Sequence, residues 1–317
     1  MGRTGPMGST GGAAGVAWPY RRLSEYLRRR FGARVRKIPL DAGLTCPNRD
    51  GTKGVGGCAY CVDETFSPSA GRRSVAEQVA AALARPRKPG DRFIAYFQPA
   101  SNTYAPVDRL REMYDQAVSA PEVVALAVGT RPDCAPDPVL DLLQSYTGRV
   151  DVWVEYGLQS AHDRTLARIN RGHGFAEFAD AVERTRGRGL RIGAHVILGL
   201  PGETRQDMME TAGRLDALSV DAVKLHHLYV ARGSALEPEY AAGRLRVLSE
   251  AEYVPLACDF MERLSQNVVM DRLIGESLRP EMVVAPRWTW SKAQVIQAIV
   301  DEFRRRGTAQ GARSRKG

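Results

Sequence analysis

The chain has 317 residues and a net charge of +9, a length that allows one large α/β domain or two smaller ones, and we expect one main domain with additions. Five cysteines, three of them close together, do not fit a disulfide framework, and the sequence contains neither a secretory signal nor an apolar run of about 18 residues. We therefore expect a soluble, cytoplasmic protein without a membrane partner.

The positive charge is concentrated at the two ends of the chain. Residues 21–37 carry eight basic residues against one acidic residue, and residues 304–317 carry six basic residues and no acidic one. The rest of the chain has 31 basic and 35 acidic residues and is mildly acidic. Basic ends of this kind suit a polyanion such as RNA, although solvated charged faces are the ordinary alternative.

The N-terminal region divides into three segments. Residues 1–17 are rich in Gly, Ser and Ala, show no periodicity and are predicted to be disordered. Apolar residues then recur at helical spacing through residues 18–31, opposite a face of arginines, which predicts a basic amphipathic helix. A first strand is predicted over residues 35–40.

A loop with three cysteines follows the first strand. Cys46, Cys58 and Cys61 combine a Cys-x2-Cys pair with an earlier cysteine, a spacing that can aim three thiolates at one metal centre. Structural zinc takes four protein ligands, yet the nearest histidine in the sequence is His162. A [4Fe–4S] cluster held by three thiolates leaves one iron free for a small molecule, so the missing fourth ligand favours a catalytic cluster. The alternative is a glycine-rich turn with incidental buried thiols.

Helix-period and strand-period segments then alternate through six strand–helix units. Apolar strands separated by helices predict a parallel sheet that is buried on both faces. Six units fit an open, incomplete (β/α) barrel or a doubly wound sheet, and in both folds the working residues lie at the carboxyl ends of the strands. The strands are predicted over residues 35–40, 92–97, 123–128, 150–156, 190–198 and 222–229, and the helices over residues 74–84, 107–118, 137–146, 162–169, 175–188 and 206–218.

Polar and glycine residues gather after all six predicted strands. One such segment alone reads as an ordinary strand-to-helix turn, but six at the same end of a sheet indicate a shared site. The segments are the cysteine loop and residues 98–104, 129–134, 155–160, 195–203 and 224–233.

The motifs in these segments resemble those of the radical S-adenosylmethionine (SAM) superfamily. Within it they are most similar to the branch that contains the Elongator catalytic subunit and the bacterial YhcC/YtqA-type proteins, over about residues 20–290. The resemblance rests on Cys46-Pro-Asn-Arg-Asp-Gly, Gly-Gly-Cys58-Ala-Tyr-Cys61, Tyr96-Phe-Gln98, Asn102-Thr-Tyr104, Gly129-Thr-Arg-Pro-Asp133, Gly157-Leu-Gln159-Ser160, Ile169-Asn-Arg171-Gly-His173 and Leu198-Gly-Leu-Pro-Gly-Glu203.

This resemblance implies a fold and a chemistry. The fold is a partial, TIM-like (β/α)6 barrel over residues 18–265, in which Cys46, Cys58 and Cys61 hold a [4Fe–4S] cluster. SAM binds the open iron and is cleaved reductively to methionine and a 5′-deoxyadenosyl radical, which abstracts hydrogen from the substrate. An electron donor such as flavodoxin or ferredoxin is implied as a partner.

The same resemblance implies SAM contacts, with two departures from the usual pattern. The cysteine spacing is C-x11-C-x2-C where C-x3-C-x2-C is common, and residues 98–104 replace a Gly-Gly-Glu motif that often binds the SAM amino group. Gln159 and Arg171 match contacts of the methionine moiety, and a guanidinium suits its carboxylate. The candidate cofactor-binding residues are Gln98, Ser101, Asn102, Gln159, Arg171, His195, Gly199, His226, Leu228 and Val230.

The remaining cysteines and the C-terminal region complete the sequence predictions. Cys134, after the third strand, is a candidate catalytic thiol that could meet the substrate or a radical, with an inert buried cysteine as the alternative. Cys258 is predicted to lie in the core. Residues 266–306 are predicted to form an extension that closes the open side of the barrel, and residues 307–317 a disordered basic tail.

The sequence leads to one functional hypothesis and two alternatives. The hypothesis is a radical SAM enzyme that acts on RNA and modifies the wobble uridine of a tRNA, which rests on family analogy and on the basic ends. The first alternative is a radical SAM enzyme with a small-molecule or protein substrate. The second is a non-catalytic iron–sulfur or zinc-binding module that senses redox state.

Overall fold

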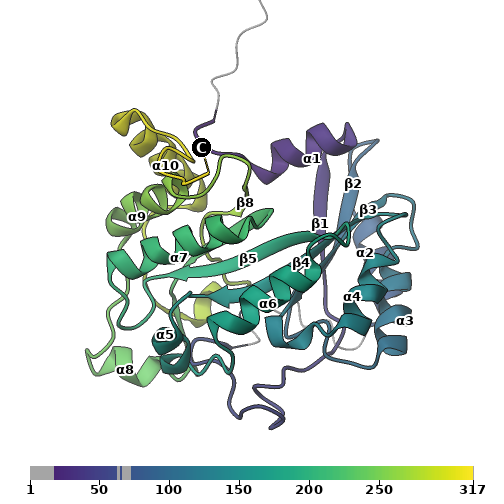
Figure 1. The fold of residues 1–317 in the computed structure, drawn as a ribbon, viewed down its shortest axis with the longest axis horizontal. Helices are drawn as coiled ribbons and strands as arrows, with labels where there is room; N and C mark the ends of the chain where they lie inside the picture. The colour runs from purple at the N-terminus through teal and green to yellow at the C-terminus, as the bar shows by residue number, and fades with distance from the viewer. Residues whose placement is uncertain (1–17, 63–64, 66–72, 317) are drawn as a thin grey trace, which may run out of the picture.

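The structure is a computed structural model that describes residues 18–62, 65 and 73–316. The segment 1–17, for which disorder is predicted, lies outside the described residues. Seven parallel strands form one sheet in the spatial order β1-β2-β3-β4-β5-β6-β8. This order follows the chain without the reversal that marks a doubly wound sheet, and the sheet curls into a half-barrel (Figure 1). The predicted α/β fold, a partial TIM-like barrel, is confirmed.

The strands form where the sequence predicts them because they are apolar runs that become buried on both faces. β4 is buried at eight of its nine positions, as expected for a central strand of a parallel sheet. β8 adds a seventh strand, which pairs with β6. The strands of the sheet are β1 (Val35–Leu40), β2 (Arg92–Phe97), β3 (Val123–Thr130), β4 (Asp151–Gln159), β5 (Arg191–Leu198), β6 (Ala222–His227) and β8 (Val269–Arg272).

Helices connect the strands and pack around the sheet (Figure 1). The capping box predicted at Ser74 is present, since its hydroxyl accepts from the Glu77 backbone amide at 3.2 Å and the Glu77 carboxylate accepts from the Ser74 amide at 2.7 Å. The helices after the first strand are α2 (Val75–Leu83), α3 (Val107–Ala117), α4 (Asp137–Gln144), α5 (Asp163–Arg168), α6 (Phe175–Thr185), α7 (Arg205–Leu218), α8 (Glu237–Ala241), α9 (Glu250–Glu262) and α10 (Lys292–Arg306).

The gap between the two edge strands, β1 and β8, is bridged by an ion pair. The Lys37 ammonium lies 2.7 and 2.8 Å from the two carboxylate oxygens of Asp271. The helix α1 (Leu23–Phe31) packs against both edge strands, whereas α10 packs against α9. The strand β8 of the extension 266–306 pairs with β6 at the open edge of the sheet, and α10 packs against α9. Closure of the open side of the barrel by this extension stays a prediction.

The amino end of the half-barrel is plugged by α1. Leu27 is buried there among residues of the first halves of the strands, and the Tyr26 and Trp153 rings meet edge to face at 5.7 Å. In Figure 1, α1 lies at the top, and the loop after β1 descends to the opposite side. The carboxyl end of the sheet is therefore the end available for a site.

Residues 307–316 are ordered, which differs from the predicted disordered tail. Gln310 is buried, and its side chain donates to the carbonyls of Ser265 and Val268 at 2.8 and 2.7 Å. Its backbone amide donates to the carbonyl of Pro19 at 2.8 Å. One amide side chain thus anchors a polar segment that has no periodicity of its own, and it brings the two basic ends of the chain together.

Three smaller features complete the fold. A short antiparallel ladder joins β7 (Val230–Ala231) to β9 (Val283–Ala285), which the sequence does not predict. Cys258 is fully buried in α9, as predicted. Within the described residues, every helix is too short or too polar to cross a lipid bilayer.

Candidate active site

The carboxyl ends of the strands surround one cavity, and the three-cysteine loop forms part of its wall. Cys46, Cys58 and Cys61 all line this cavity. The loop turns tightly, with the Cys61 amide donating to the Cys58 carbonyl at 2.9 Å. Gly57 has a φ of 76°, and a β-carbon there would lie 2.9 Å from the Arg49 side chain. Only glycine allows both this backbone conformation and this close approach.

Within the described residues, the three cysteine sulfurs do not belong to a compact group of metal-ligand atoms. In the described part of the chain, one group of at least three His, Cys, Asp or Glu residues has all its potential ligand atoms within 4.8 Å of one another. None of these three cysteines belongs to that group. Tetrahedral zinc with Zn–S bonds of about 2.3 Å holds its sulfurs about 3.8 Å apart. A cubane cluster binds each thiolate to a different iron and holds them further apart. Three cysteines that line one cavity without forming such a compact group are compatible with a [4Fe–4S] cluster.

Two arginines stabilise the cysteines in the thiolate form that a metal requires. An Arg171 guanidinium nitrogen lies 3.4 Å from the Cys58 sulfur, and Arg49 lies 3.3 Å from the Cys61 sulfur. Burial alone would raise the pKa of the Cys58 thiol, but the Arg171 charge outweighs it and lowers that pKa below its ordinary value. Arg49 also donates to the Cys61 carbonyl at 3.0 Å, which fixes its position.

Arg171 is itself held rigidly from behind. Its guanidinium donates to the Gly157 carbonyl at 2.6 Å, and its own carbonyl accepts from Arg131 at 2.7 Å. Arg131 is 2% exposed and pairs with Asp133 at 2.8 Å. Arg49 and Arg131 are not among the predicted site residues, although Arg49 lies in the motif that begins at Cys46 and Arg131 in the motif Gly129-Thr-Arg-Pro-Asp133.

Most of the predicted SAM contacts are brought together by the fold. Gln98 and Ser101 follow β2, Gln159 ends β4, and the histidines come from β5 and β6. Their binding of SAM stays a prediction. The predicted residues that line the cavity with the cysteines are Gln98, Ser101, Gln159, Arg171, His195, His226 and Leu228.

Three predicted contacts lie outside the lining of this cavity. The Asn102 side chain donates to the carbonyls of Pro99 and Gly129 at 2.7 and 3.0 Å, so it holds the turn after β2. Gly199 lines a second cavity. Val230 is fully buried in β7. Sequence position alone could not separate these residues from those whose side chains point inward.

Cys134, the candidate catalytic thiol, is also outside the cavity lining. It is 6% exposed in the turn Pro132–Cys134, where its carbonyl accepts from Thr103 at 2.5 Å. Burial, and next the Asp133 charge, raise the pKa of this thiol to about 12. The structure therefore favours the alternative of an inert buried cysteine.

A charged layer forms the floor of the cavity, and the sequence analysis did not predict it. The Lys224 ammonium pairs with the Glu155 carboxylate and donates to the Tyr96 hydroxyl at 2.7 Å. His195 contacts Glu155 at 2.9 Å, and Asp271 lies 3.2 Å from Lys224. A signal was available, because lysine and glutamate interrupt otherwise apolar strands.

The protonation of this floor follows from its burial and pairing. Burial raises the pKa of Glu155, but Lys224 and Lys37 together hold it well below its usual range. Burial and the Lys224 charge lower the pKa of His195, which is therefore a neutral imidazole near pH 7. The floor of the cavity therefore contains the Lys224–Glu155 ion pair, whose charges balance, and the neutral imidazole of His195.

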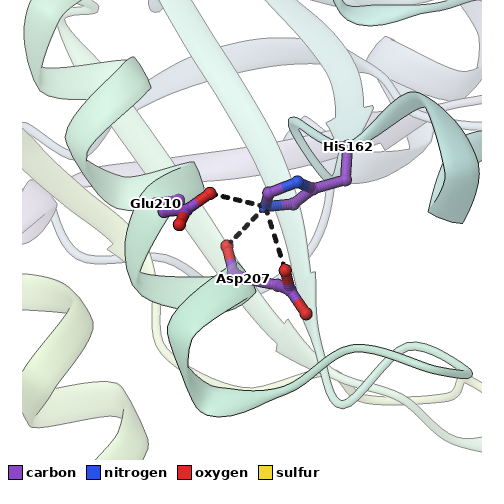
Figure 2. A group of neighbouring side chains, drawn as sticks. All are labelled: His162, Asp207 and Glu210. Atoms are coloured by element: carbon purple, nitrogen blue, oxygen red, sulfur yellow. Dashed lines mark hydrogen bonds and ion pairs between the residues drawn. The ribbon is translucent and has the colours of Figure 1, made fainter.

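His162, Asp207 and Glu210 form the one compact group of potential metal ligands in the described residues (Figure 2). The His162 ring nitrogen contacts the Asp207 backbone carbonyl at 2.9 Å, and the Glu210 carboxylate is 3.8 Å away. The Asp207 carboxylate already accepts from the Thr204 amide at 2.8 Å and pairs with Arg164. Asp207 therefore takes part in the capping box of α7 and in an ion pair, and these interactions account for its position in the group.

A half-barrel with a three-cysteine loop at its carboxyl-end mouth defines an iron–sulfur enzyme of the SAM-dependent class. The chain matches the radical SAM superfamily over residues 46–215 and the radical SAM C-terminal domain over residues 220–305. Protein YhcC of Escherichia coli is 42% identical over 292 residues, which are 90% of this chain and 93% of YhcC. The chain belongs to the radical SAM superfamily, and this membership implies a [4Fe–4S] cluster and SAM as cofactors.

Two further comparisons are more distant. The structure of the archaeal Methanocaldococcus infernus Elp3 superposes with a TM-score of 0.66 at 15% identity, over 87% of this chain and 64% of Elp3, and it supports the fold alone. A tRNA uridine(34) acetyltransferase from the same organism is 27% identical over 135 residues, which are 41% of this chain and 24% of that enzyme.

Gly157→Ala tests whether the position of Arg171 depends on the glycine beneath it. A β-carbon at residue 157 would lie 2.6 Å from the Arg171 guanidinium and 2.9 Å from the Gln159 amide nitrogen. We expect this overpacking to lower the free energy of unfolding by about 1–3 kcal/mol and to reduce the iron bound per chain. Urea denaturation and iron analysis measure the two effects.

Gly213→Ala is the matched control. Gly213 lies on the exposed side of α7 with no atom within 4 Å of an added β-carbon. It should keep full iron content and gain up to about 1 kcal/mol of stability from helix propensity. If Gly157→Ala and Gly213→Ala had the same stability and the same iron content, the close contact at Gly157 would not be what positions Arg171.

Proposed function

We propose that the protein holds a [4Fe–4S] cluster on Cys46, Cys58 and Cys61 and uses it to act on a substrate in the half-barrel. When bound, the reduced cluster supplies the electron that splits SAM into methionine and a 5′-deoxyadenosyl radical, which abstracts hydrogen from the substrate. The observation that carries the proposal is the loop of three cysteines that line one cavity, with an arginine beside two of their sulfurs.

The other residues of the cavity would bind and orient the cofactor. Arg171 and Arg49 keep the thiolates charged, since each guanidinium lies within 3.4 Å of a cysteine sulfur. Gln98, Ser101 and Gln159 offer polar groups near the cysteine loop for the methionine end of SAM. Serine 101 supports this role, because its hydroxyl is buried beside the cavity without a hydrogen-bond partner in the described residues.

Anaerobic reconstitution with iron and sulfide, followed by SAM and dithionite, tests this proposal. We expect a brown protein that releases 5′-deoxyadenosine only when dithionite is present. Omission of dithionite is the control, because the cleavage requires an electron. A colourless protein that holds zinc and releases no 5′-deoxyadenosine would instead support the metal-binding or redox-sensing module.

A tRNA wobble uridine is the substrate that we propose for this chemistry, with a small molecule or a protein as the alternative. The support comes from the partial similarity to the tRNA uridine(34) acetyltransferase and from the basic ends of the chain. Those ends meet at Gln310, beside the helix that plugs the amino end of the barrel. An RNA bound there would have to reach around the molecule to enter the cavity.

The nucleoside profile of tRNA from a deletion strain decides between these substrates. If tRNA is the substrate, one modified uridine should disappear and return when the gene is restored. An unchanged profile would exclude the tRNA proposal and leave the small-molecule or protein substrate. Action in the cytoplasm, with flavodoxin or ferredoxin as the electron donor, stays a prediction.

A further inference from the structure

Arg272 places in the wall of the cavity a positive charge that no described residue pairs with. It ends β8, is half-buried and lines the cavity. Within the described part of the chain, its guanidinium makes no hydrogen bond or ion pair. The other cations that line the cavity each contact a carboxylate, a carbonyl or a thiolate sulfur. They are Arg49, Arg131, Arg171 and Lys224.

A bulge in β8 is what turns Arg272 inward. Consecutive residues of a regular strand point to opposite faces of the sheet. Here Val223 pairs with Met270 and Lys224 pairs with Arg272, so Asp271 is the extra residue between them. Asp271 and Arg272 therefore both face the interior. The Asp271 carboxylate pairs with Lys37 and Lys224, and Arg272 has no acidic partner among the residues that the structure describes.

A second unsatisfied group lies close to this charge. The Nε2 atom of His226 is buried without a hydrogen-bond partner in the residues that the structure describes. Burial, and next the Arg272 charge, hold the pKa of His226 well below its usual range, so its ring is neutral. The ring stacks on that of His195 with centroids 6.2 Å apart. Arg272 and His226 thus offer a cation and a neutral hydrogen-bonding group on one wall.

We infer that Arg272 binds an oxyanion of the substrate, a carboxylate or a phosphate, and so selects an anionic substrate. A planar guanidinium matches either group through two parallel hydrogen bonds. The inference rests on the proposed function, since it names the chemistry of the substrate for that site.

The position of Arg272 favours the substrate over the carboxylate of SAM. Arg272 follows Asp271, which belongs to the charged floor, whereas the cysteine sulfurs have their own arginines, Arg49 and Arg171. The methionine end of SAM would bind beside the cysteine loop. An anion at Arg272 would therefore lie on the floor side of the cavity, away from the cysteine loop beside which the SAM carboxylate would bind.

Chemical modification of arginines tests the site without an identified substrate. Phenylglyoxal should modify Arg272, and millimolar inorganic phosphate or succinate should slow that modification, as followed by peptide mass spectrometry. Arg28 is the internal control, because it is an exposed arginine of α1 far from the cavity. We expect protection of about tenfold at Arg272 and none at Arg28. Stronger protection by phosphate would indicate a phosphorylated substrate. Stronger protection by succinate would indicate a substrate that carries a carboxylate. Equal rates with and without both anions would overturn the inference.

A variant separates substrate binding from SAM binding. Arg272→Gln should still release 5′-deoxyadenosine from SAM and dithionite without added substrate, with a KM for SAM within about twofold of that of the wild type. Arg28→Gln is the control with the same change of charge. A rise of tenfold or more in the KM for SAM would assign Arg272 to the SAM carboxylate and overturn the inference. If the wild type itself releases no 5′-deoxyadenosine, the proposed function fails, and the protection result still decides whether Arg272 binds an anion.

Discussion

Replacement of Cys58 by alanine is expected to abolish iron binding and 5′-deoxyadenosine formation completely. Two remaining thiolates cannot hold a cluster that already lacks a fourth protein ligand. Cys58 is also the buried member of the three and the one in contact with Arg171, at 3.4 Å. The measurements are iron and sulfide per chain, the visible absorbance after anaerobic reconstitution, and release of 5′-deoxyadenosine.

Two other cysteines provide matched controls for this change. Cys258→Ala removes a thiol that is fully buried in α9, so it should cost about 1 kcal/mol of stability and leave the iron content unchanged. Cys134→Ser should also keep the cluster, because Cys134 does not line the cavity. If Cys58→Ala kept its iron while Cys134→Ser lost it, our assignment of the ligands would be wrong.

The cysteine loop was predictable because its information is local. Three cysteines and several glycines within sixteen residues are enough to indicate a metal centre, whatever the rest of the chain does. The strands were predictable for a related reason, since a parallel sheet buried on both faces requires apolar runs. The order of the strands then follows from the short helical connections between them.

The floor of the cavity was not predictable because it depends on register. Lys37, Glu155, Lys224 and Asp271 come from four strands, and the sequence of each strand alone does not show its partners in the other strands. Only the pairing of those strands shows that the four charges balance. The inward direction of Arg272 likewise depends on a bulge, for which the sequence of β8 gives no glycine or proline signal.

The direction of the predicted SAM-binding side chains also depends on the three-dimensional fold. Asn102, Gly199 and Val230 occur in the motif segments but do not line the cavity that contains the cysteines. A motif places a segment at the mouth of the barrel without deciding which side chains face inward. The tail was mispredicted because one buried residue, Gln310, orders a segment that has no pattern.

Lys224→Met is expected to cause the largest loss of stability among the substitutions considered, about 3–5 kcal/mol, because it leaves buried carboxylates without their main counter-charge. Lys224 is 3% exposed and pairs with Glu155 and, at 3.2 Å, with Asp271. Lys292→Met is the control, since its pair with Glu276 is about half exposed and should be worth at most about 1 kcal/mol. Urea denaturation of both variants measures the difference.

The pH dependence of this loss distinguishes a charge effect from a loss of packing. In the wild type, the pKa values of Glu155 and Asp271 are lowered, so their contribution is present above their unfolded values of about 4 and is lost as the pH falls further. Without Lys224, burial should raise these pKa values, and protonation then relieves the buried charge. The destabilisation by Lys224→Met should therefore be smaller at pH 5 than at pH 8. A loss that is equal at both pH values would mean that the unpaired carboxylate charges do not cause the destabilisation.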